Sequence, residues 1–316
     1  MTNILIVGGI ILYKKIVIYF LLSVFLLTSC SNNEEKSNQT ELLLYTSVYP
    51  IQFVIEQITG DEATVRSIYP PGVDAHTYEP TTKEVTAIAN ADAFIFIGGG
   101  MENFAETAAE ALQKQNVQLV ELSKQKKLFI SSQTGEEANN TNKDLDPHIW
   151  LDPAKMIEIS ELIKDLLIEL SPNNEEAFTH NFSNLKNELE ELDKAYQNVL
   201  MEKEHKELLV THAAYGYWEN RYGIEQIAIS GLSSSDEPSQ KELANIARFA
   251  LDKDIHYVLF EQTSSSRIGT IIQEYIQAEK LYIHPLEVLT EEDIKNNETY
   301  LTLMYKNLDM LDKATK

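Results

Sequence analysis

Short apolar runs alternate with longer amphipathic stretches along most of the chain. The short runs are rich in β-branched and aromatic residues and predict buried strands, at residues 42–48, 65–69, 93–97, 117–122, 207–211, 226–230, 256–260 and 281–284. The longer stretches repeat apolar residues at helical spacing and predict helices, at residues 51–58, 82–90, 102–113, 153–170, 174–201 and 239–252, after Ala214, from Arg267 and at 300–311. Strands that alternate with helices indicate parallel sheets covered by helices, so we predict an α/β fold.

The predicted helix at residues 174–201 carries one long apolar stripe. Its apolar side chains are spaced alternately by four and three residues, which places them on one face, and they are Phe178, Phe182, Leu185, Leu189, Leu192, Tyr196 and Val199. Such a helix spans roughly 40 Å and can join two βα halves as a rigid spine. The alternative is the seam of a coiled-coil oligomer. Because only one such segment exists, we expect a monomer with an N-terminal lobe at 41–171, a spine at 172–204 and a C-terminal lobe at 205–316.

The first forty residues predict export and anchoring. Lys14 and Lys15 precede an apolar run at 16–27 that is shorter than the ~20 residues of a membrane-spanning helix. The sequence Leu-Thr-Ser-Cys that ends at Cys30 resembles the lipobox of bacterial lipoproteins. The resemblance implies a signal peptide at 1–29, and a lipidated Cys30 with a flexible tether at 30–40. The alternative is that Cys30 ends an uncleaved membrane helix.

Composition and charge narrow the function classes. Cys30 is the only cysteine, so we expect neither a disulfide nor a thiolate ligand in the exported part. The formal net charge of −23 argues against nucleic acid as a partner, because that binding depends on Lys and Arg. The negative charge suits solubility and a weak attraction for cations. By itself it does not predict a metal site, because most of these carboxylates are expected on solvated helix faces.

Four metal-capable side chains follow predicted strands, two in each half of the chain: His76, His148, His212 and Glu287. In open α/β sheets, ligands gather at the carboxyl ends of strands, so a cleft between the lobes can bring the four together. Three neutral imidazoles and one carboxylate suit Zn²⁺, whereas Mn²⁺ prefers a set richer in oxygen. Because protonated imidazole cannot bind metal, such a site should release its ion as the pH falls toward ~6.5.

Other polar residues are alternative metal ligands or candidates for orienting the four ligands. His284 is a rival ligand and Glu261 a rival acid. We expect Glu261 to orient an imidazole through its remaining N–H group, and three further residues can do the same: Asp74, Asp146 and Tyr215. The remaining histidines are expected to be solvated at His180 and His205 and structural at His256. Three aromatic residues are expected in core or cleft packing: Tyr49, Trp150 and Trp218.

Three sequence segments carry a family resemblance. They are Gly-Val-Asp-Ala-His-Thr-Tyr-Glu-Pro at 72–80, Asp-Pro-His-Ile-Trp at 146–150, and Ile-Ser-Gly-Leu-Ser at 229–233 followed by Glu-Pro-Ser at 237–239. Together they resemble the zinc/manganese solute-binding proteins of ABC importers, the cluster A-I class, over residues 45–311. The segment at 229–239 looks like the zinc-type members, and manganese members carry a carboxylate where this chain has His212.

The resemblance implies a fold of two βα lobes joined by one rigid helix, with the metal site in the cleft between them. It implies that His76, His148, His212 and Glu287 are the ligands of Zn²⁺, with Mn²⁺ as the alternative metal. It also implies an extracytoplasmic, lipid-anchored protein at the bacterial cell membrane that delivers metal to an ABC permease with its ATPase. One departure is the segment at 131–146, which contains no histidine where many zinc members have a His-rich loop.

A zinc hydrolase and a surface adhesin are the alternatives to a transport function. A zinc hydrolase needs an open coordination position and a general base, a part that Glu287 or Glu261 could take. The sequence has neither a His-Glu-x-x-His helix nor a nucleophile elbow, and Gly98–Gly100 lack the Gly-Lys-Ser/Thr of a phosphate-binding loop. A surface adhesin is the other class, but no segment marks an adhesive surface. We therefore predict a binding protein and not an enzyme.

Overall fold

A computed structural model of the chain describes residues 41–131, 145–233, 236, 238–262 and 266–316. The predicted signal peptide at 1–29, Cys30 with its tether, and most of the segment at 131–146 lie outside these residues. Residues Glu41–Lys316 form one compact unit. Within the described ranges, no helix has both the length and the apolar character needed to cross a membrane.

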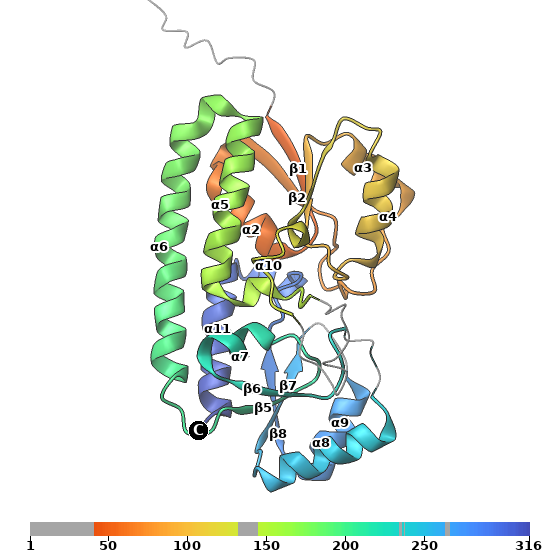
Figure 1. The fold of residues 1–316 in the computed structure, drawn as a ribbon, viewed down its shortest axis with the longest axis vertical. Coiled ribbons are helices and arrows are strands. Elements are labelled where there is room, and N and C mark those ends of the chain that lie inside the picture. The colour runs from red at the N-terminus through yellow and green to blue at the C-terminus, as the bar shows by residue number, and fades with distance from the viewer. Residues whose placement is uncertain (1–40, 132–144, 234–235, 237, 263–265) are drawn as a thin grey trace, which may run out of the picture. The chain divides into compact units, whose positions relative to one another are not determined.

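The N-terminal half of this unit is built on a parallel sheet with the strand order β2-β1-β3-β4 (Figure 1). The strands are β1 (Leu42–Thr46), β2 (Ala63–Ser67), β3 (Ala93–Phe96) and β4 (Gln118–Glu121). The connecting helices are α2 (Tyr49–Thr59), α3 (Thr82–Ala89) and α4 (Asn103–Leu112). Because β2 and β3 lie on opposite sides of β1, the strand order reverses there, and ligands bind at such a point in open α/β sheets.

The C-terminal half repeats this topology with the order β6-β5-β7-β8, again parallel throughout. The strands are β5 (Glu207–Val210), β6 (Glu225–Ala228), β7 (Tyr257–Glu261) and β8 (Glu279–Ile283). The helices are α7 (Gly216–Tyr222), α8 (Gln240–Asp252), α9 (Arg267–Ile276), α10 (Glu291–Lys295) and α11 (Tyr300–Ala314). The predicted α/β fold with two parallel sheets is therefore confirmed.

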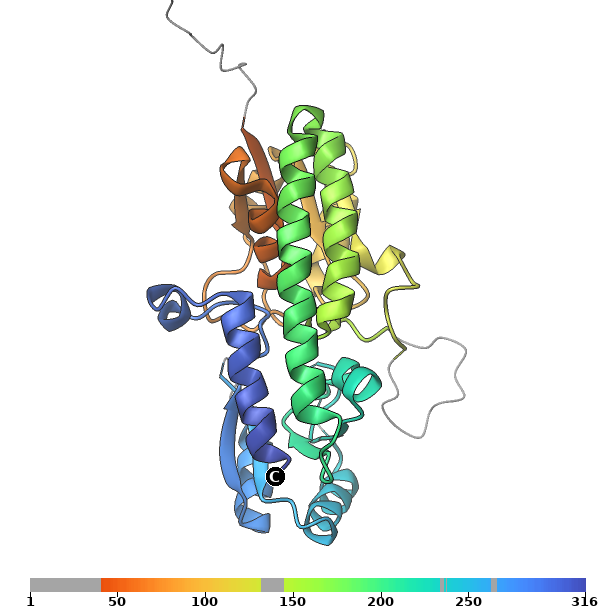
Figure 2. The same ribbon diagram turned by 90° about the vertical axis from the view of Figure 1, so that its left-hand side faces the viewer.

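The long helix α6 (Glu175–Leu200) runs along both halves, and α5 (Pro153–Leu170) packs beside it in the N-terminal half (Figure 2). Asp152 begins α5, because its carboxylate accepts hydrogen bonds from the N–H groups of Ala154 and Lys155. Helix α6 has 26 residues, a length of roughly 39 Å. It packs against α5 and α2 of the N-terminal half and against α11 of the C-terminal half.

The apolar stripe of α6 packs inside the unit and not outward as an oligomer seam would. Five of the seven stripe residues are buried, namely Phe178, Leu185, Leu189, Leu192 and Tyr196. Tyr196 also donates a hydrogen bond to the carbonyl of Met304 on α11, at 2.7 Å. Phe182 and Val199 are half-buried. The long helix therefore serves as a support for both halves.

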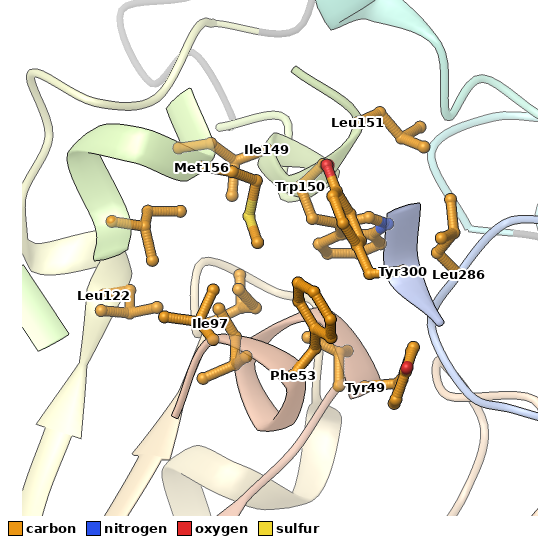
Figure 3. Close-up of a cluster of buried hydrophobic side chains, with 14 of the residues drawn as sticks. Tyr49, Phe53, Ile97, Leu122, Ile149, Trp150, Leu151, Met156, Leu286 and Tyr300 are labelled. Carbon is orange, nitrogen blue, oxygen red and sulfur yellow. The ribbon is translucent and has the colours of Figure 1, made fainter. Parts of the chain in front are cut away.

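One hydrophobic core runs through both halves and the long helices. Its centre lies at the junction of the halves, around Phe53, Trp150, Leu286 and Tyr300 (Figure 3). The Trp150 indole N–H donates to the carbonyl of Pro285 at 2.9 Å, and the Tyr300 hydroxyl donates to the carbonyl of Trp150 at 2.7 Å. A smaller core packs α8 and α9 onto the C-terminal sheet. The expected packing roles of Trp150, Trp218 and Tyr49 agree with their burial.

Element ends differ from the sequence-based expectations by one to three residues. The strand expected at 226–230 spans Glu225–Ala228, and the one expected at 281–284 spans Glu279–Ile283. His256, expected to open a strand as a structural residue, lies just before β7 with its side chain 69% exposed, which corrects that expectation. The helix expected at 82–90 begins as expected, because Thr81 and Glu84 form a capping box at the start of α3.

Candidate metal centre

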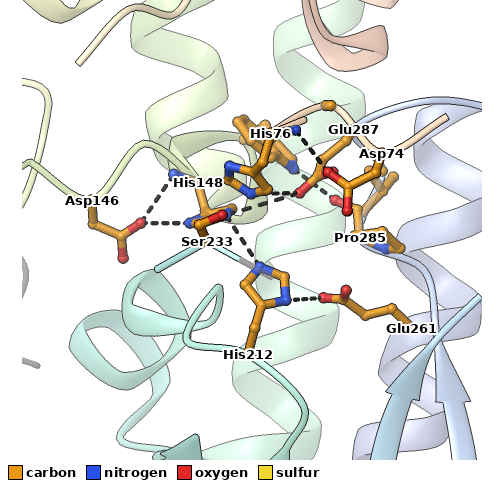
Figure 4. Close-up of polar contacts among 12 residues, drawn as sticks. Asp74, His76, Asp146, His148, His212, Ser233, Glu261, Pro285 and Glu287 are labelled. Carbon is orange, nitrogen blue, oxygen red and sulfur yellow. Dashed lines mark hydrogen bonds and ion pairs between the residues drawn. The ribbon is translucent and has the colours of Figure 1, made fainter. Parts of the chain in front are cut away.

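Four side chains from four loops meet at one point between the two sheets (Figure 4). His76 lies in the loop after β2, His212 in the loop after β5 and Glu287 in the loop after β8. His148 lies far beyond the end of β4 at Glu121, just before the short turn Ile149–Leu151 that leads into α5. One ligand atom from each lies within 4.8 Å of one ligand atom from every other. The structure therefore brings together the four residues that the sequence selected, two from each half. The topology accounts for the placement of His76, His212 and Glu287, because parallel strands turn their carboxyl ends to the same edge of a sheet. His148 reaches the same point from the segment that leads into α5.

All four side chains are buried. The exposed fraction is 5% for His76, 0% for His148, 2% for His212 and 5% for Glu287. Burial of polar groups is costly unless each has a partner, so the contacts around these four residues decide what the site can bind.

His148 is held by Asp146 from the start of its own segment. The Asp146 Oδ1 atom accepts from the backbone N–H of His148 at 3.0 Å and contacts the ring Nδ1 at 2.9 Å. A carboxylate accepts only, so Nδ1 carries the hydrogen and Nε2 presents a lone pair. Burial lowers the pKa of His148, and this loss outweighs the opposing effect of Asp146. The imidazole is therefore neutral and suited to bind a cation.

His212 is held in the same way by Glu261 at the end of β7. The Glu261 Oε1 atom lies 2.6 Å from Nδ1 of His212 and accepts a hydrogen bond from the Tyr215 hydroxyl at 3.2 Å. Burial alone would lower the pKa of His212, but the nearby carboxylates, chiefly Glu261, raise it to about 9. Without a metal, His212 is consequently protonated at neutral pH.

His76 and Glu287 form the other side of the site. The Nε2 atom of His76 lies 3.5 Å from Oε1 of Glu287, and Nε2 of His148 lies 3.9 Å from the same oxygen. Burial raises the pKa of the Glu287 carboxyl, but His76 more than offsets this and the net pKa is lowered. Asp74 shapes the turn before His76, because its Oδ1 atom accepts the N–H groups of His76 and Thr77 at 2.9 and 3.2 Å.

Two ring nitrogens of the site lie closer together than two nitrogens with facing lone pairs would. Nε2 of His212 lies 3.4 Å from Nε2 of His148, and the three imidazole centroids are 5.3 to 5.8 Å apart. Two lone pairs repel at this distance, so either a proton or a cation must lie between them. A set of three imidazoles and one carboxylate fits a tetrahedral, borderline-soft divalent ion.

His284 lies near the site but is not part of the group of four. Its ring is occupied at both nitrogens, by the Leu286 N–H at 2.9 Å and by Asp293 Oδ2 at 3.1 Å. Its backbone N–H bonds to Asn307. The partners Asp293 and Asn307 were missed by the sequence reasoning, because they are 9 and 23 residues away and belong to no motif. His180 and His205 are exposed, as expected.

A separate apolar groove lies between α8 and α9. It has a volume of about 360 Å³, and its lining includes Leu243, Ile271, Ile272 and Tyr275. None of its lining residues can bind a metal through nitrogen or carboxylate. The groove therefore has no part in the chemistry of the histidine site.

The sequence matches one family over most of its length. The family described as "Zinc-uptake complex component A periplasmic", ZnuA, matches residues 44–314. The chain belongs to this family. Members of the ZnuA family are solute-binding proteins rather than enzymes, and the family description makes them one component of an uptake complex.

Two curated relatives have related names. The zinc-binding lipoprotein AdcA of Streptococcus pneumoniae is 33% identical over 293 residues, which cover 90% of this chain and 58% of AdcA. This chain thus spans little more than half the length of AdcA. The high-affinity zinc uptake system protein ZnuA of Bacillus subtilis is 29% identical over 291 residues, which cover 89% of this chain and 91% of that protein.

A solved structure gives the same fold. The crystal structure of the Zn(II)-bound ZnuA-like domain of Streptococcus pneumoniae AdcA matches with a TM-score of 0.73 and 33% sequence identity. The match covers 87% of this chain and 99% of that domain. The two-lobed fold expected from the resemblance is therefore the fold of a known ZnuA-like domain.

Proposed function

We propose that this chain is the extracytoplasmic Zn²⁺-binding component of an ABC metal importer, with His76, His148, His212 and Glu287 as the four zinc ligands. The observation that carries the proposal is the convergence of three buried imidazoles and one buried carboxylate within 4.8 Å. Its chemistry agrees with the zinc named in the descriptions of the family, of AdcA and of ZnuA.

The neighbouring carboxylates prepare the site for its cargo. Asp146 and Glu261 hold Nδ1 of His148 and His212, so both rings turn Nε2 toward the same point. The Tyr215 hydroxyl donates a hydrogen bond to the Glu261 oxygen that contacts His212 and so helps to hold this carboxylate in place. This ligand set favours Zn²⁺ over Mn²⁺, because imidazole is a better ligand for the softer ion. Mn²⁺ remains the alternative cargo that the ligand set would bind more weakly.

Capture and release require the ligands to separate, because each is at most 5% exposed. His76 and His148 come from the N-terminal half, and His212 and Glu287 come from the C-terminal half. A Zn²⁺ ion bound by all four bridges the halves and holds the segment that carries Glu287 in place. The loaded form then docks on the permease, which works with its ATPase.

The proposal includes the location and organisation of the chain. The signal peptide at 1–29 is removed, Cys30 is lipidated, and a tether at 30–40 leaves the lobes at the outer face of the cell membrane. The lobes are those expected from the sequence, 41–171 and 205–316, with the spine at 172–204. The name "lipoprotein" of the AdcA relative supports the anchor.

The two alternative classes gain less support. A hydrolase needs a coordination position for water, whereas four protein ligands already complete a tetrahedral site. An adhesin role would be an addition to transport and leaves the metal site unchanged.

Elemental analysis of the purified full chain tests the proposal. We expect about one zinc per chain for the parent and for His256→Ala, a matched control that replaces an exposed histidine. For His148→Ala we expect the Zn²⁺ affinity to fall by roughly 100-fold. Loss of a residue that only orients a ligand already weakens binding by about 10- to 100-fold, so loss of a ligand itself should reach at least the upper end of that range. Equal zinc content and equal affinity in the parent and His148→Ala would refute this ligand set.

A further inference from the structure

The segment that carries Glu287 is buried although it has no regular secondary structure. It comprises residues 284–290, between β8 and α10, and is here called the Glu287 segment. Buried backbone groups need hydrogen-bond partners, and several of its carbonyl groups find them in the N-terminal half. The Tyr49 N–H donates to the carbonyl of Glu287 at 2.8 Å, and the Gly72 N–H donates to that of Leu289 at 3.0 Å.

His284 anchors the start of this segment. Asn307 on α11 binds both its backbone N–H and its carbonyl, each at 2.8 Å. Ring atom Nδ1 of His284 accepts the N–H of Leu286 at 2.9 Å, so the ring hydrogen must be on Nε2. Nε2 then donates to Asp293 Oδ2 at 3.1 Å, and the same oxygen accepts the N–H of Thr290 at 2.8 Å. One buried imidazole thus joins both ends of the segment.

Leu286 has an unusual backbone conformation immediately before Glu287. Its φ is +65°, in the left-handed region that a branched side chain rarely adopts. Two interactions hold it there: the side chain is fully buried, and the N–H is bonded to His284. The direction in which Glu287 leaves the backbone depends on this turn.

We propose that His284, steadied by Asp293, is a positioning residue for the metal site. Its Nδ1 atom holds the left-handed turn at Leu286 and thereby aims the Glu287 carboxylate at the imidazoles. Figure 4 shows the Glu287 carboxylate beside His76 and His148. His284 acts only through Glu287, because its own ring nitrogens are both occupied. The inference rests on the proposed function, since it assigns a further residue to the same site.

A double-mutant cycle on the full chain tests this role. Zn²⁺ affinity is measured by competition with a chromophoric chelator for the parent, His284→Gln, Glu287→Gln and the double variant. Glutamine keeps a donor near Asp293 but removes the acceptor for the Leu286 N–H. We expect His284→Gln to weaken zinc binding by about tenfold or more. In the Glu287→Gln background, the same change should alter affinity by less than about twofold, because the residue through which it acts is already gone.

The outcomes separate the two proposals. Additive losses, or full affinity in His284→Gln, overturn the positioning role and leave Glu287 as a ligand. Full affinity in Glu287→Gln overturns the ligand set itself. If His284→Gln does not fold, Asp293→Asn replaces it in the same cycle, with a smaller but still non-additive loss expected. His256→Gln, which changes an exposed histidine, should leave affinity unchanged.

Discussion

Two imidazoles of the site, His148 and His212, each rest against a carboxylate at Nδ1 and point Nε2 at the same place. Their pKa values nevertheless move in opposite directions. Burial dominates at His148 and lowers its pKa, whereas the pKa of His212 reaches about 9 because Glu261 and other carboxylates lie close to it. The raised pKa of His212 therefore places a proton between its ring and that of His148, whose Nε2 atom is 3.4 Å away, in the metal-free protein.

Zinc affinity should consequently depend on pH well above the range of free imidazole. Protonated His212 cannot bind metal, so apparent Zn²⁺ affinity should rise about tenfold per pH unit up to about 9 and level off above it. Competition titrations from pH 6.5 to 9.5 measure this slope. Glu261→Gln should lower the pKa of His212 and move the plateau to lower pH. An affinity that is constant between pH 7 and 9 would contradict the protonated state of His212.

The proton on His212 also makes the stability of the metal-free protein depend on pH, in the direction opposite to that of zinc affinity. Because the folded pKa of His212 is raised to about 9 from ~6.5, its contribution to stability is complete below pH ~6.5 and is lost as the pH rises through about 9. High pH thus favours binding, while low pH favours the empty protein.

Replacing an imidazole by a carboxylate should change metal preference. In His212→Glu, the introduced oxygen ligand favours the harder ion, so the ratio of Zn²⁺ to Mn²⁺ affinity should fall by roughly tenfold, or about 1.4 kcal/mol. Isothermal calorimetry with each metal measures this ratio. His256→Glu adds the same charge at an exposed position and should leave it unchanged. An unaltered ratio in His212→Glu would refute the argument from ligand softness.

At the residue scale, the sequence predicted which four residues converge but not what holds them. Each predicted ligand lies in a recognisable segment, and His76, His212 and Glu287 lie in the loops that follow strands. The anchoring of Glu287 through His284, Asp293 and Asn307 depends on distances that no local pattern encodes.

At the scale of elements, helix α6 is tied to α7 through one buried carboxylate. Asp193 accepts from Nε and Nη2 of Arg221 at 2.6 and 2.5 Å, and from the Tyr222 hydroxyl at 2.9 Å. Asp193 is only 9% exposed. This polar contact adds to the packing of the stripe residue Tyr196 against the rings of Trp218 and Tyr222 on α7.

Removing that carboxylate should destabilise the fold. Asp193→Ala leaves the Tyr222 hydroxyl without its acceptor and leaves the Arg221 guanidinium with Asp152, 3.3 Å from Nε. We expect a loss of about 2 kcal/mol, reduced from the value for a fully buried pair because Arg221 is partly exposed. Chemical denaturation followed by circular dichroism measures it. Glu188→Ala, an exposed change on the same helix, should cost less than about 0.5 kcal/mol. Equal effects of the two changes would contradict the role given to Asp193.

The sequence predicted whether each element is a helix or a strand, because the helical spacing of apolar residues differs clearly from the short apolar runs of buried strands. It did not predict the residues at which the elements end. The stripe of α6 and the capping box at Thr81 are local patterns that survive folding. The ends of β6 and β8 shift because the last residues of a strand depend on whether the neighbouring strand supplies a partner.

At the scale of the molecule, the two sheets share one large core, although α8 and α9 pack on the C-terminal sheet through a second, smaller one. One continuous core runs beneath the site, and bonds such as Trp218 to the carbonyl of Leu151 cross between the halves. The sequence predicted two similar lobes and a spine. It did not predict their shared core, because burial at the junction depends on how the finished halves meet.

Zinc should therefore stabilise the whole unit and not one half. At a free concentration of 1,000 times the dissociation constant, binding adds about 4 kcal/mol, which should raise the melting temperature by ~8 °C in one cooperative transition. Calorimetry with and without a chelator measures this shift. At the same zinc concentration, the roughly 100-fold weaker His148→Ala should keep only about 1.4 kcal/mol of this stabilisation, so the shift should fall to ~3 °C. Two separate transitions, of which only one responds to zinc, would contradict a bridge between the halves.

The four donor atoms of the site are nitrogen and oxygen, and the only cysteine of the chain, Cys30, precedes the folded unit. Thiolate ligands are lost when oxidants convert them to disulfides or sulfenic acids. Imidazole and carboxylate groups have no such reaction under the same conditions. A site of this composition keeps its affinity for the ion under oxidising conditions without thiols. A site built from thiolates would need a reductant to keep binding metal there.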